Sequence, residues 1–409
     1  MSSASNHNVR VLAAPDAQSV SRELVRIGAA RDEICRLTPQ GLFRLVRLHD
    51  VPTPAAIILK QEMLAFGGDA ALHARALTGG LETTDVILLG TEQQISEASQ
   101  RIGTYAEGLS AIGETIAAAL CHYATPPAAL RCGPYLLPFG QKTYVMGILN
   151  LTADSFSGDG LIGDVDRVVQ RAAQMLDDGA DILDIGGEST RPGAEEVAAD
   201  EELHRVIPAV RALAARFSVP ISVDTTKSAV AREALAAGAT IINDISGLRF
   251  DPEMAAVVAA AHAPVVVMHI QGTPRTMQHH PQYTDLMTEV CAYLQESTAL
   301  AMAAGIPRDQ VVLDPGFGFG KTIAHNLELL RRLRELTSFG QPILVGTSRK
   351  STIGRVLGDL PPEERREGTA ATVAISIANG ADIVRVHDVK EMARVAKMTD
   401  AITRAFIDE

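Results

Sequence analysis

Polar residues suited to binding and acid–base chemistry stand at the ends of short apolar segments throughout residues 142–409. The first segment, Tyr144–Leu149, is followed by Asn150 and by a polar loop of hydroxyls, carboxylates and glycines up to Gly160. Seven later segments end in Glu188-Ser189-Thr190-Arg191, Asp224-Thr225-Thr226-Lys227, Asn243-Asp244, His269, Asp314, Ser348-Arg349-Lys350-Ser351 and Arg385-Val386-His387. A buried polar group without a partner costs about 1–3 kcal/mol, so these ends are predicted to converge on one ligand.

The residue types in this set suit a flat heterocycle that carries an anionic group. A carboxylate such as Asp224 or Asp314 can accept two parallel N–H bonds, as from the ring N–H and exocyclic amine of a pterin or guanine edge. Asn243 adds an amide and Lys350 adds a cation. Donors for an anion are supplied by Arg191, Arg385 and His387.

Asn150 offers a neutral oxygen, which suits a hard cation such as Mg²⁺ that keeps most of its water and binds substrate phosphate. Structural roles stay open at this point. Asp224 could cap the helix that follows it, and the glycine-rich stretch Asp314–Lys321 could be only a turn. The three glycines of that stretch also allow close backbone approach, which favours a binding site.

The elements that must position these residues alternate between strand and helix. Strands are predicted at Tyr144–Leu149, Ile182–Ile185, Ile221–Val223, Ile241–Ile242, Val265–Met268, Val311–Leu313, Ile343–Val345 and Ile383–Val386. Helices are predicted at Val165–Asp178, Glu201–Arg216, Val230–Ala237, Pro252–Ala261, Thr284–Ala304, Asn326–Leu336, Thr369–Asn379 and Val389–Phe406. Gly179, Gly238 and Gly380 stand where three helices end and the next strand begins, as helix C-caps do.

This alternation predicts an α/β fold, a (β/α)₈ barrel in which polar groups at the carboxyl ends of the strands ring one mouth. A doubly wound open sheet is the alternative. No GxGxxG follows the first strand, which counts against a dinucleotide-binding fold.

The preceding part of the chain is predicted to be a smaller α/β domain of unknown role with a linker, over residues 1–138, with the barrel over 139–409. Strands are predicted at Arg44–Leu48, Ala55–Leu59 and Asp85–Leu89, and helices from Lys60, at Glu92–Arg101 and at Tyr105–Tyr123. Gly67-Gly68-Asp69 is interpreted as a turn, because no strand–loop–helix surrounds it. Four prolines between Ala124 and Gly140 indicate the linker.

Composition narrows the class of protein. A chain of 409 residues with 46% hydrophobic content is long enough for two domains, and it lacks the run of ~20 apolar residues that would span a bilayer. The cysteines are scattered at Cys35, Cys121, Cys132 and Cys291, and no secretion signal is visible, which points to the cytoplasm. A net charge of −12 argues against a nucleic-acid partner.

The stretches described above resemble the dihydropteroate synthases, in the order in which that family has them. The matching segments are Gly147–Ser157, Asp184–Ala194, Ser222–Thr225, Ile242–Ile245, Met268–Pro274, Asp314–Lys321, Ser348–Ser351 and Arg385–Asp388. Two departures lie in the first loop. Ala153 replaces the family's usual proline, and Ser157-Gly158-Asp159-Gly160 places the carboxylate one position later.

The resemblance implies a (β/α)₈ transferase of folate biosynthesis. It would condense 6-hydroxymethyl-7,8-dihydropterin diphosphate with p-aminobenzoate to give 7,8-dihydropteroate and diphosphate, as a cytoplasmic homodimer that uses Mg²⁺. The pterin would be held by Asp224, Asn243, Met268, Asp314 and Lys350. The p-aminobenzoate pocket would include Thr190, Arg191, Phe319 and Ser351. Arg385 and His387 would bind the diphosphate, and Asn150 would ligate Mg²⁺. Asp154 would act in catalysis together with Thr190, Arg191, Lys350, Arg385 and His387.

An arylamine is a weak neutral nucleophile, and diphosphate leaves only when its growing charge is neutralised. An electron-rich pterin can stabilise a methylene cation, so a dissociative displacement without a dedicated general base is expected. Two other functions are consistent with parts of the pattern. A methyltetrahydrofolate-dependent methyltransferase on a similar barrel would not need Lys350 or Arg385-Val386-His387. A non-catalytic pterin-binding protein would not need the loop residues Asp154 and Arg191.

Overall fold

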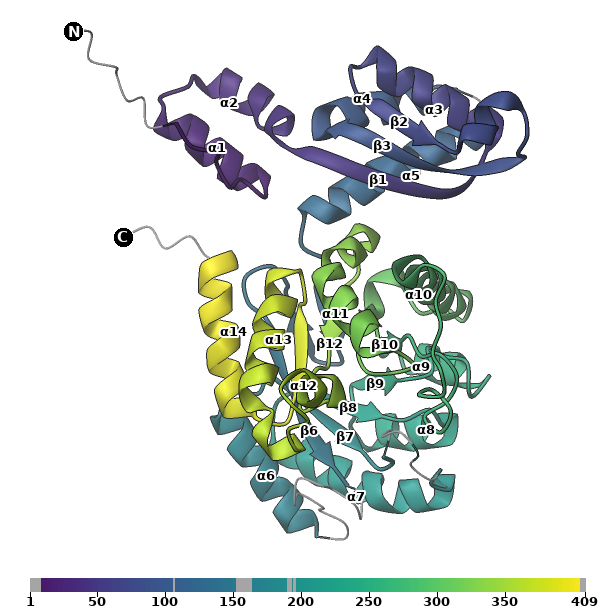
Figure 1. The fold of residues 1–409 in the computed structure, drawn as a ribbon. Coiled ribbons are helices and arrows are strands. Elements are labelled where there is room, and N and C mark those ends of the chain that lie inside the picture. The colour runs from purple at the N-terminus through teal and green to yellow at the C-terminus, as the bar shows by residue number, and fades with distance from the viewer. Residues whose placement is uncertain (1–8, 106, 152–163, 190–192, 194–195, 405–409) are drawn as a thin grey trace, which may run out of the picture. The chain divides into compact units, whose positions relative to one another are not determined.

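The computed structural model describes residues 9–105, 107–151, 164–189, 193 and 196–404, and the chain divides into two compact units (Figure 1). The first unit is Met1–Thr125 and the second is Pro126–Glu409. No helix in the described part of the chain is long and apolar enough to cross a membrane.

The second unit is built on an eight-stranded parallel sheet in the order β11-β10-β9-β8-β7-β6-β13-β12. Its strands are β6 Tyr144–Asn150, β7 Ile182–Gly186, β8 Ile221–Asp224, β9 Ile241–Asp244, β10 Val265–Met268, β11 Val311–Asp314, β12 Leu344–Val345 and β13 Ile383–Val386. A parallel bridge joins Leu313 of β11 to Ile343, the residue directly before β12, so the first and last strands of this order are neighbours. The sheet therefore closes, and the predicted (β/α)₈ barrel is confirmed, with all eight predicted strands present.

Helices surround the barrel, and at least one lies between each two successive strands, with two, α12 and α13, between β12 and β13 (Figure 1). They are α6 Val165–Asp177, α7 Ala199–Arg216, α8 Ser228–Ala237, α9 Met254–Ala260, α10 Leu286–Ala303, α11 Ile323–Arg331, α12 Ser351–Val356, α13 Arg366–Ala378 and α14 Val389–Thr403. Short 3₁₀ segments occur at η3 Arg308–Gln310, η4 Leu333–Phe339 and η5 Pro362–Glu364. Gly179, Gly238 and Gly380 have φ of +106°, +115° and +96°, which confirms their predicted place at helix ends.

The helix predicted at Asn326–Leu336 is divided in the structure. The α-helix ends at Arg331, and the segment from Leu333 continues as a 3₁₀-helix. Leu333 and Leu336 are its buried residues. Their spacing of three places both on one face of a helix with three residues per turn.

A hairpin closes the bottom of the barrel, opposite to the carboxyl ends of the strands. It consists of β4 Leu130–Cys132 and β5 Tyr135–Leu137, which pair antiparallel. Its buried side chains form one cluster with Tyr144, Met146, Ile182, Ile241, Val266, Val312, Leu344 and Ile383, most of which lie near the start of a barrel strand. The proline-rich segment assigned to a linker is therefore part of the barrel unit, and the predicted boundary at residue 138 moves to residue 125.

This packing predicts different behaviour for two truncated chains. A fragment spanning residues 126–409 should keep the barrel's unfolding transition, whereas a fragment spanning 139–409 should lose about 4 kcal/mol or more of unfolding free energy. Leu130 and Leu137 are almost fully buried, and each buried leucine contributes about 1.5–3 kcal/mol. Urea denaturation of both fragments measures the difference, and equal midpoints would show that the hairpin is dispensable.

The first unit contains a three-stranded antiparallel sheet in the order β1-β3-β2. Its elements are α1 Ala17–Arg26, α2 Arg31–Leu37, η1 Pro39–Gly41, β1 Phe43–Pro52, α3 Thr53–Ala65, β2 Asp69–Leu72, η2 Ala74–Thr78, β3 Thr83–Thr91, α4 Glu92–Ile102 and α5 Glu107–Ala124. One face of the sheet packs with α3, α4 and α5 around a core that includes Leu59, Met63, Val86, Leu88 and Ile95. The predicted smaller α/β unit is thus present.

The strand predicted at Ala55–Leu59 is wrong, because these residues lie inside helix α3. The buried residues of α3 are Thr53, Ala56, Leu59 and Met63, a spacing that repeats every three or four residues and therefore fits one helix face. Pro54 stands in the first turn, where its fixed φ favours a helix start. A short apolar run fits a strand and a helix equally well, and packing on the sheet decides between them.

Candidate active site

The carboxyl ends of the barrel strands bring the predicted polar residues to one mouth. Asn150, Asp224, Asp244 and Asp314 are the last residues of β6, β8, β9 and β11. In the parallel register Asn150 lies beside Gly186, and Gly186 lies beside Asp224. Because the strands are parallel, their carboxyl ends share one end of the barrel, where enzymes of this fold carry their active sites.

The floor of the mouth holds a charged triad that joins three strands. The Arg385 guanidinium donates from Nε to Asp184 Oδ2 at 2.6 Å and from Nη2 to Asp224 Oδ2 at 2.8 Å. Asp184 is fully buried and Asp224 nearly so. The two bonds use two of the five N–H groups of the guanidinium, and they fix its plane against both carboxylates.

Asp184 received no role from the sequence, although it belongs to a matched motif. The available signal was a charged residue inside the apolar run Ile182-Leu183-Asp184-Ile185. A carboxylate at such a position requires a buried partner, because an isolated buried charge is too costly to persist. Its Oδ1 atom is buried without a hydrogen-bond partner among the described residues, so the triad leaves one acceptor for another donor.

Gly186 keeps a space open between Asn150 and Asp224. A Cβ atom placed on Gly186 would lie 3.9 Å from Asn150 Oδ1 and 3.9 Å from Asp224 Oδ2. The two oxygens therefore face a common space that any side chain at residue 186 would enter. Among the residues that the structure describes, no cluster of three or more His, Cys, Asp or Glu side chains is arranged to hold a metal ion. A single amide oxygen at an open space suits Mg²⁺ that is bound mainly by water and phosphate.

The second part of the floor is formed by Asp314 and Lys350. Asp314 Oδ1 accepts from Gly316 N at 2.7 Å, and Lys350 Nζ donates to the carbonyl of Phe317. The same ammonium lies over the Phe319 ring, 4.5 Å from its centroid, which is the geometry of a cation–π contact. Gly318 has a φ of +85°, and a Cβ there would come within 2.9 Å of Lys350 Cδ, so this position requires glycine.

Burial shifts the pKa values of Asp224 and Lys350 toward neutral pH. It raises the pKa of Asp224 to about 7, an effect that Arg385 opposes. It also raises the pKa of Asp314, and it lowers the pKa of Lys350 to about 8. The charges of Asp314 and Asp224 raise the pKa of Lys350, and the charge of Arg385 lowers it. These four side chains therefore lie close enough to influence one another's protonation.

An apolar cluster lines the mouth beside these charges. Met268 and Phe319 pack together with Ile245, Ile270 and Met277, and all five side chains are buried. Asn243 is also buried, on the strand next to Asp224. An apolar wall next to a few convergent polar groups is the usual composition of a small-molecule site.

Asp244 has a structural role in the turn after β9. Its carboxylate accepts from Ser246 N at 2.8 Å and from Leu248 N at 3.0 Å. Leu248 has a φ of +67°, which is uncommon for a residue other than glycine. Asp244 therefore fixes the shape of this loop, and burial raises the pKa of its carboxyl to about 6.

Lys321, at the end of the glycine-rich stretch, is buried and ties that stretch to the loop after β10. Its Nζ contacts the carbonyls of Gly316 at 3.0 Å and Phe319 at 3.1 Å, and His269 Nδ1 at 2.8 Å. Burial lowers the pKa of Lys321 and of His269. Because one of two bonded nitrogens must accept, the pair holds at most one positive charge.

Replacing Lys321 with methionine is expected to lower the free energy of unfolding by about 2 kcal/mol or more. The change leaves two buried carbonyls without their donor and the imidazole nitrogen of His269 without its partner, at about 1–3 kcal/mol for each unsatisfied group. Chemical denaturation measures the loss. Lys397→Met on an exposed part of α14 is the matched control and should change stability by less than about 0.5 kcal/mol. Equal stabilities for both variants would contradict a fastening role for Lys321.

His387 and Ser351 stand on the side of the mouth formed by β12 and β13. His387 donates from its main-chain N to Ser348 Oγ at 3.1 Å, and its ring Nδ1 lies 3.0 Å from the same oxygen. Ser351 begins helix α12 and lines a cavity of about 280 Å³ together with Gly318 and Lys321. The cavity thus adjoins the loop that carries Phe319.

Three of the predicted site residues, Asp154, Thr190 and Arg191, lie outside the described residues. The residues just before Thr190, at the start of the loop after β7, are described. Lys227 Nζ contacts Glu188 and also donates to Glu202 Oε2 at 2.7 Å. Glu202 belongs to helix α7 and is fully buried. Lys227 therefore links Glu188, at the start of the loop after β7, to helix α7.

Comparison with known proteins adds independent information on this geometry. The profile of the pterin binding enzyme family matches residues 146–387. The chain is 50% identical over 285 residues to the dihydropteroate synthase of Synechocystis sp., which covers 70% of this chain and 98% of that protein. It is 40% identical over 369 residues to a probable bifunctional folylpolyglutamate synthase/dihydropteroate synthase of Halobacterium salinarum, covering 90% of this chain and 44% of that protein.

Solved structures give the same result for the fold. The dihydropteroate synthase of Yersinia pestis in a sulfonamide drug complex matches with a TM-score of 0.66 and 47% identity, over 68% of this chain and 100% of that one. The dihydropteroate synthase of Burkholderia cenocepacia, complexed with 7,8-dihydropteroate, matches with a TM-score of 0.62 and 42% identity, over 68% of this chain and 98% of that one.

Proposed function

This chain belongs to the dihydropteroate synthase family, transferases of folate biosynthesis, and we propose that the two substrates of the family meet at the mouth of its barrel. The reaction forms 7,8-dihydropteroate from a pterin-methyl diphosphate and p-aminobenzoate. The observation that carries the assignment of the site is the convergence of Asp224, Asp314, Lys350 and Arg385 at one end of the barrel, where the charges of neighbours affect the pKa values of Asp224 and Lys350.

We propose that Asp224, Asn243, Asp314 and Lys350 hold the pterin, against the apolar wall that includes Met268. The support is chemical. Buried carboxylates with raised pKa values can accept the paired N–H groups of a pterin edge, which would offset the cost of their burial. The amide of Asn243 and the ammonium of Lys350 supply further hydrogen-bond partners for the donors and acceptors of a flat heterocycle.

The p-aminobenzoate is placed over Phe319 and next to Ser351. The cation–π contact of Lys350 with Phe319 supports a shared boundary between the two substrate pockets. The cavity of about 280 Å³ beside Ser351 gives room on that side. Thr190 and Arg191 are proposed to complete this pocket, and Asp154 is proposed to act from the first loop.

The diphosphate is assigned to Arg385 and His387, which lie on β13 and directly after it. Asn150 would hold Mg²⁺ at the open space above Gly186, where the ion would neutralise phosphate charge when bound. The Arg385 guanidinium uses only two of its five N–H groups on Asp184 and Asp224, which leaves donors that could face an anion. Donors that are already oriented stabilise developing charge without reorganisation.

The reaction step that this arrangement favours is dissociative. The bond between the pterin methylene and the diphosphate oxygen breaks as donors stabilise the leaving group, and the arylamine nitrogen then attacks the methylene carbon. The amine proton passes to water or to the released diphosphate. No residue is required to act as a dedicated general base in this scheme.

Turnover with both substrates tests the function directly. The full chain should release diphosphate only when the pterin diphosphate and p-aminobenzoate are both present. Chelation of Mg²⁺ should stop turnover, and added Mg²⁺ should restore it. Methyl transfer from methyltetrahydrofolate without diphosphate release would favour the methyltransferase, and pterin binding without turnover would favour a non-catalytic binding protein.

We propose in addition a homodimer and a cytoplasmic location, as the family resemblance implies. The four cysteines are free thiols, which is consistent with a reducing compartment. Sedimentation of the purified chain tests the oligomeric state.

The titration of the floor predicts a bell-shaped pH dependence of kcat/KM for the pterin substrate. Ionised Asp224 accepts the pterin, so activity should fall as pH decreases through about 7. Protonated Lys350 is also required, so activity should fall as pH increases through about 8. The limbs report the coupled groups together. Lys350→Arg should move the alkaline limb to higher pH, because a guanidinium keeps its proton, and an unmoved limb would exclude Lys350 as its source.

A further inference from the structure

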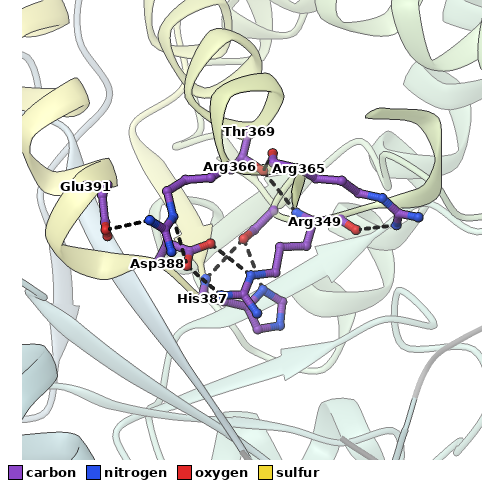
Figure 2. A network of polar contacts seen from close by, with 8 residues as sticks. Arg349, Arg365, Arg366, Thr369, His387, Asp388 and Glu391 are labelled. Carbon is purple, nitrogen blue, oxygen red and sulfur yellow. Dashed lines mark hydrogen bonds and ion pairs between the residues drawn. The ribbon is translucent and has the colours of Figure 1, made fainter. Parts of the chain in front are cut away.

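Two loops at the mouth, residues 348–350 after β12 and 387–388 after β13, are connected by an ion pair that the function proposed above does not use. The Arg349 guanidinium donates from Nε to Asp388 Oδ2 at 2.9 Å and from Nη2 to Asp388 Oδ1 at 2.5 Å. This is a two-point contact, and Figure 2 shows it at the centre of a larger polar network. A fork-to-fork contact of this kind fixes orientation as well as distance.

The environment of the pair keeps the Asp388 carboxylate charged. The Asp388 side chain is 6% exposed and the Arg349 side chain 19%. Burial alone would raise the pKa of Asp388, but the hydrogen bonds and charge of Arg349, with the charge of Arg366, outweigh it and hold the pKa below its ordinary value. The pair is therefore stronger than an exposed ion pair, which contributes little.

The main chain of Arg349 is held in an unusual conformation from outside the mouth. Its φ is +58°, in the left-handed region that residues other than glycine rarely occupy. Arg349 N donates to Thr369 Oγ1 at 3.1 Å, and Arg349 O accepts from Arg365 Nη1 at 2.8 Å (Figure 2). Backbone strain that is held in place by surrounding bonds is found preferentially at functional sites.

The residues next to the pair in sequence are the two proposed to act on substrate. Lys350 follows Arg349, and His387 precedes Asp388. Ser348 supplies a second connection between the loops, because its Oγ contacts both the main-chain N and the ring Nδ1 of His387. The two loops are thus joined at two successive positions, 348 to 387 and 349 to 388.

We propose that Arg349 and Asp388 are positioning residues that lock the loop of Lys350 to the loop of His387, and so fix the pterin lysine relative to the diphosphate histidine. The inference rests on the proposed roles of Lys350 and His387. Lys350 is also held by the Phe317 carbonyl, which lies outside the two joined loops, whereas the bonds of His387 to Ser348 lie within them, so loss of the pair should displace mainly His387. The effect should therefore fall on binding and departure of the diphosphate and leave the pterin edge in place.

The test uses the full chain with Arg349→Met, Asp388→Asn and the double variant. Each single variant is expected to lower kcat about 10- to 100-fold, since small misplacements of reacting groups have effects of this size. The double variant should be no worse than the more damaged single, because the two residues act as one unit. Inhibition by inorganic diphosphate should weaken about fivefold or more, whereas affinity for the phosphate-free pterin alcohol should stay within about twofold.

Matched controls separate positioning from stability. Glu391→Gln removes the Arg366–Glu391 contact at 3.4 Å on the exposed side of the same network, and it should leave kcat and diphosphate inhibition unchanged. If Arg349→Met does not fold, Arg349→Lys keeps the charge without the fork and should lose kcat to a smaller extent. Wild-type kcat in Arg349→Lys would overturn the proposal. A loss of kcat in the double variant equal to the product of the two single losses would also overturn it.

The same measurements distinguish this proposal from the function on which it rests. Weak diphosphate inhibition in His387→Ala together with normal inhibition in Arg349→Met would overturn the positioning role and keep His387 in the site. Normal inhibition in His387→Ala would instead overturn the assignment of His387. Loss of stability in Arg349→Met with normal kcat and normal inhibition at a temperature where the variant is folded would reduce the pair to a structural fastening, which also overturns the proposal.

Discussion

Replacing Arg385 with alanine is expected to lower the free energy of unfolding by about 3–5 kcal/mol and to abolish turnover. The guanidinium bonds two buried carboxylates, Asp184 at 2.6 Å and Asp224 at 2.8 Å. Removing one member of a buried charged network leaves the others without compensation, and two carboxylates would then remain close together. The same change removes donors proposed to stabilise the departing diphosphate, so activity should be lost even in the molecules that stay folded.

Chemical denaturation and turnover, measured on the same preparation, check this expectation. Arg232→Ala is the matched control, because Arg232 forms an exposed ion pair with Glu253 at 3.5 Å and should contribute less than about 1 kcal/mol. Arg385→Lys should recover part of the stability, since an ammonium keeps the charge but not the two-point geometry. Wild-type stability in Arg385→Ala would mean that the floor carboxylates do not depend on the guanidinium.

The second large effect is expected for Asp224→Asn, which should weaken pterin binding about 100-fold or more with little change in stability. Hydrogen bonds to a charged acceptor contribute about 1.5–3 kcal/mol each, and the pterin edge is proposed to donate two. Burial raises the pKa of Asp224 to about 7, so the folded protein already tolerates a neutral group there at neutral pH. Asparagine has nearly the same shape, and Arg385 keeps its bond to Asp184.

Calorimetric titration with the phosphate-free pterin alcohol measures the binding loss without the diphosphate contacts. Asp359→Asn is a suitable control, because Asp359 is exposed in a surface ion pair with Arg355. Pterin affinity in Asp224→Asn equal to that of the unchanged protein would remove Asp224 from the pterin site. A large loss of stability in this variant would show that the carboxylate serves mainly to balance Arg385.

The architecture of the barrel could be predicted from the sequence because its signals are local. Each strand is a short, mostly apolar run, with a polar residue at its last position or within a few residues after it, at the end that forms the mouth. Hydrophobic period and glycine C-caps depend on neighbours within a few residues, so they can be read without knowledge of the fold. Three-dimensional packing was needed for α3 in the first unit and for the hairpin below the barrel, where short apolar or proline-rich segments fit more than one structure.

The sequence by itself indicated most of the described residues that stand at the mouth, although it gave no role to Asp184, and the tertiary structure decided which of them are partners. Arg385 bonds Asp184 and Asp224 across 201 and 161 residues of chain, and Arg349 bonds Asp388 across 39. No local pattern encodes such pairs, because hydrogen bonds depend on distances of about 3 Å between side chains that only the pairing of strands and the curvature of the sheet bring together. The parallel direction of the strands placed these residues at the carboxyl end of the barrel, and the three-dimensional packing decided which charged side chains bond to one another.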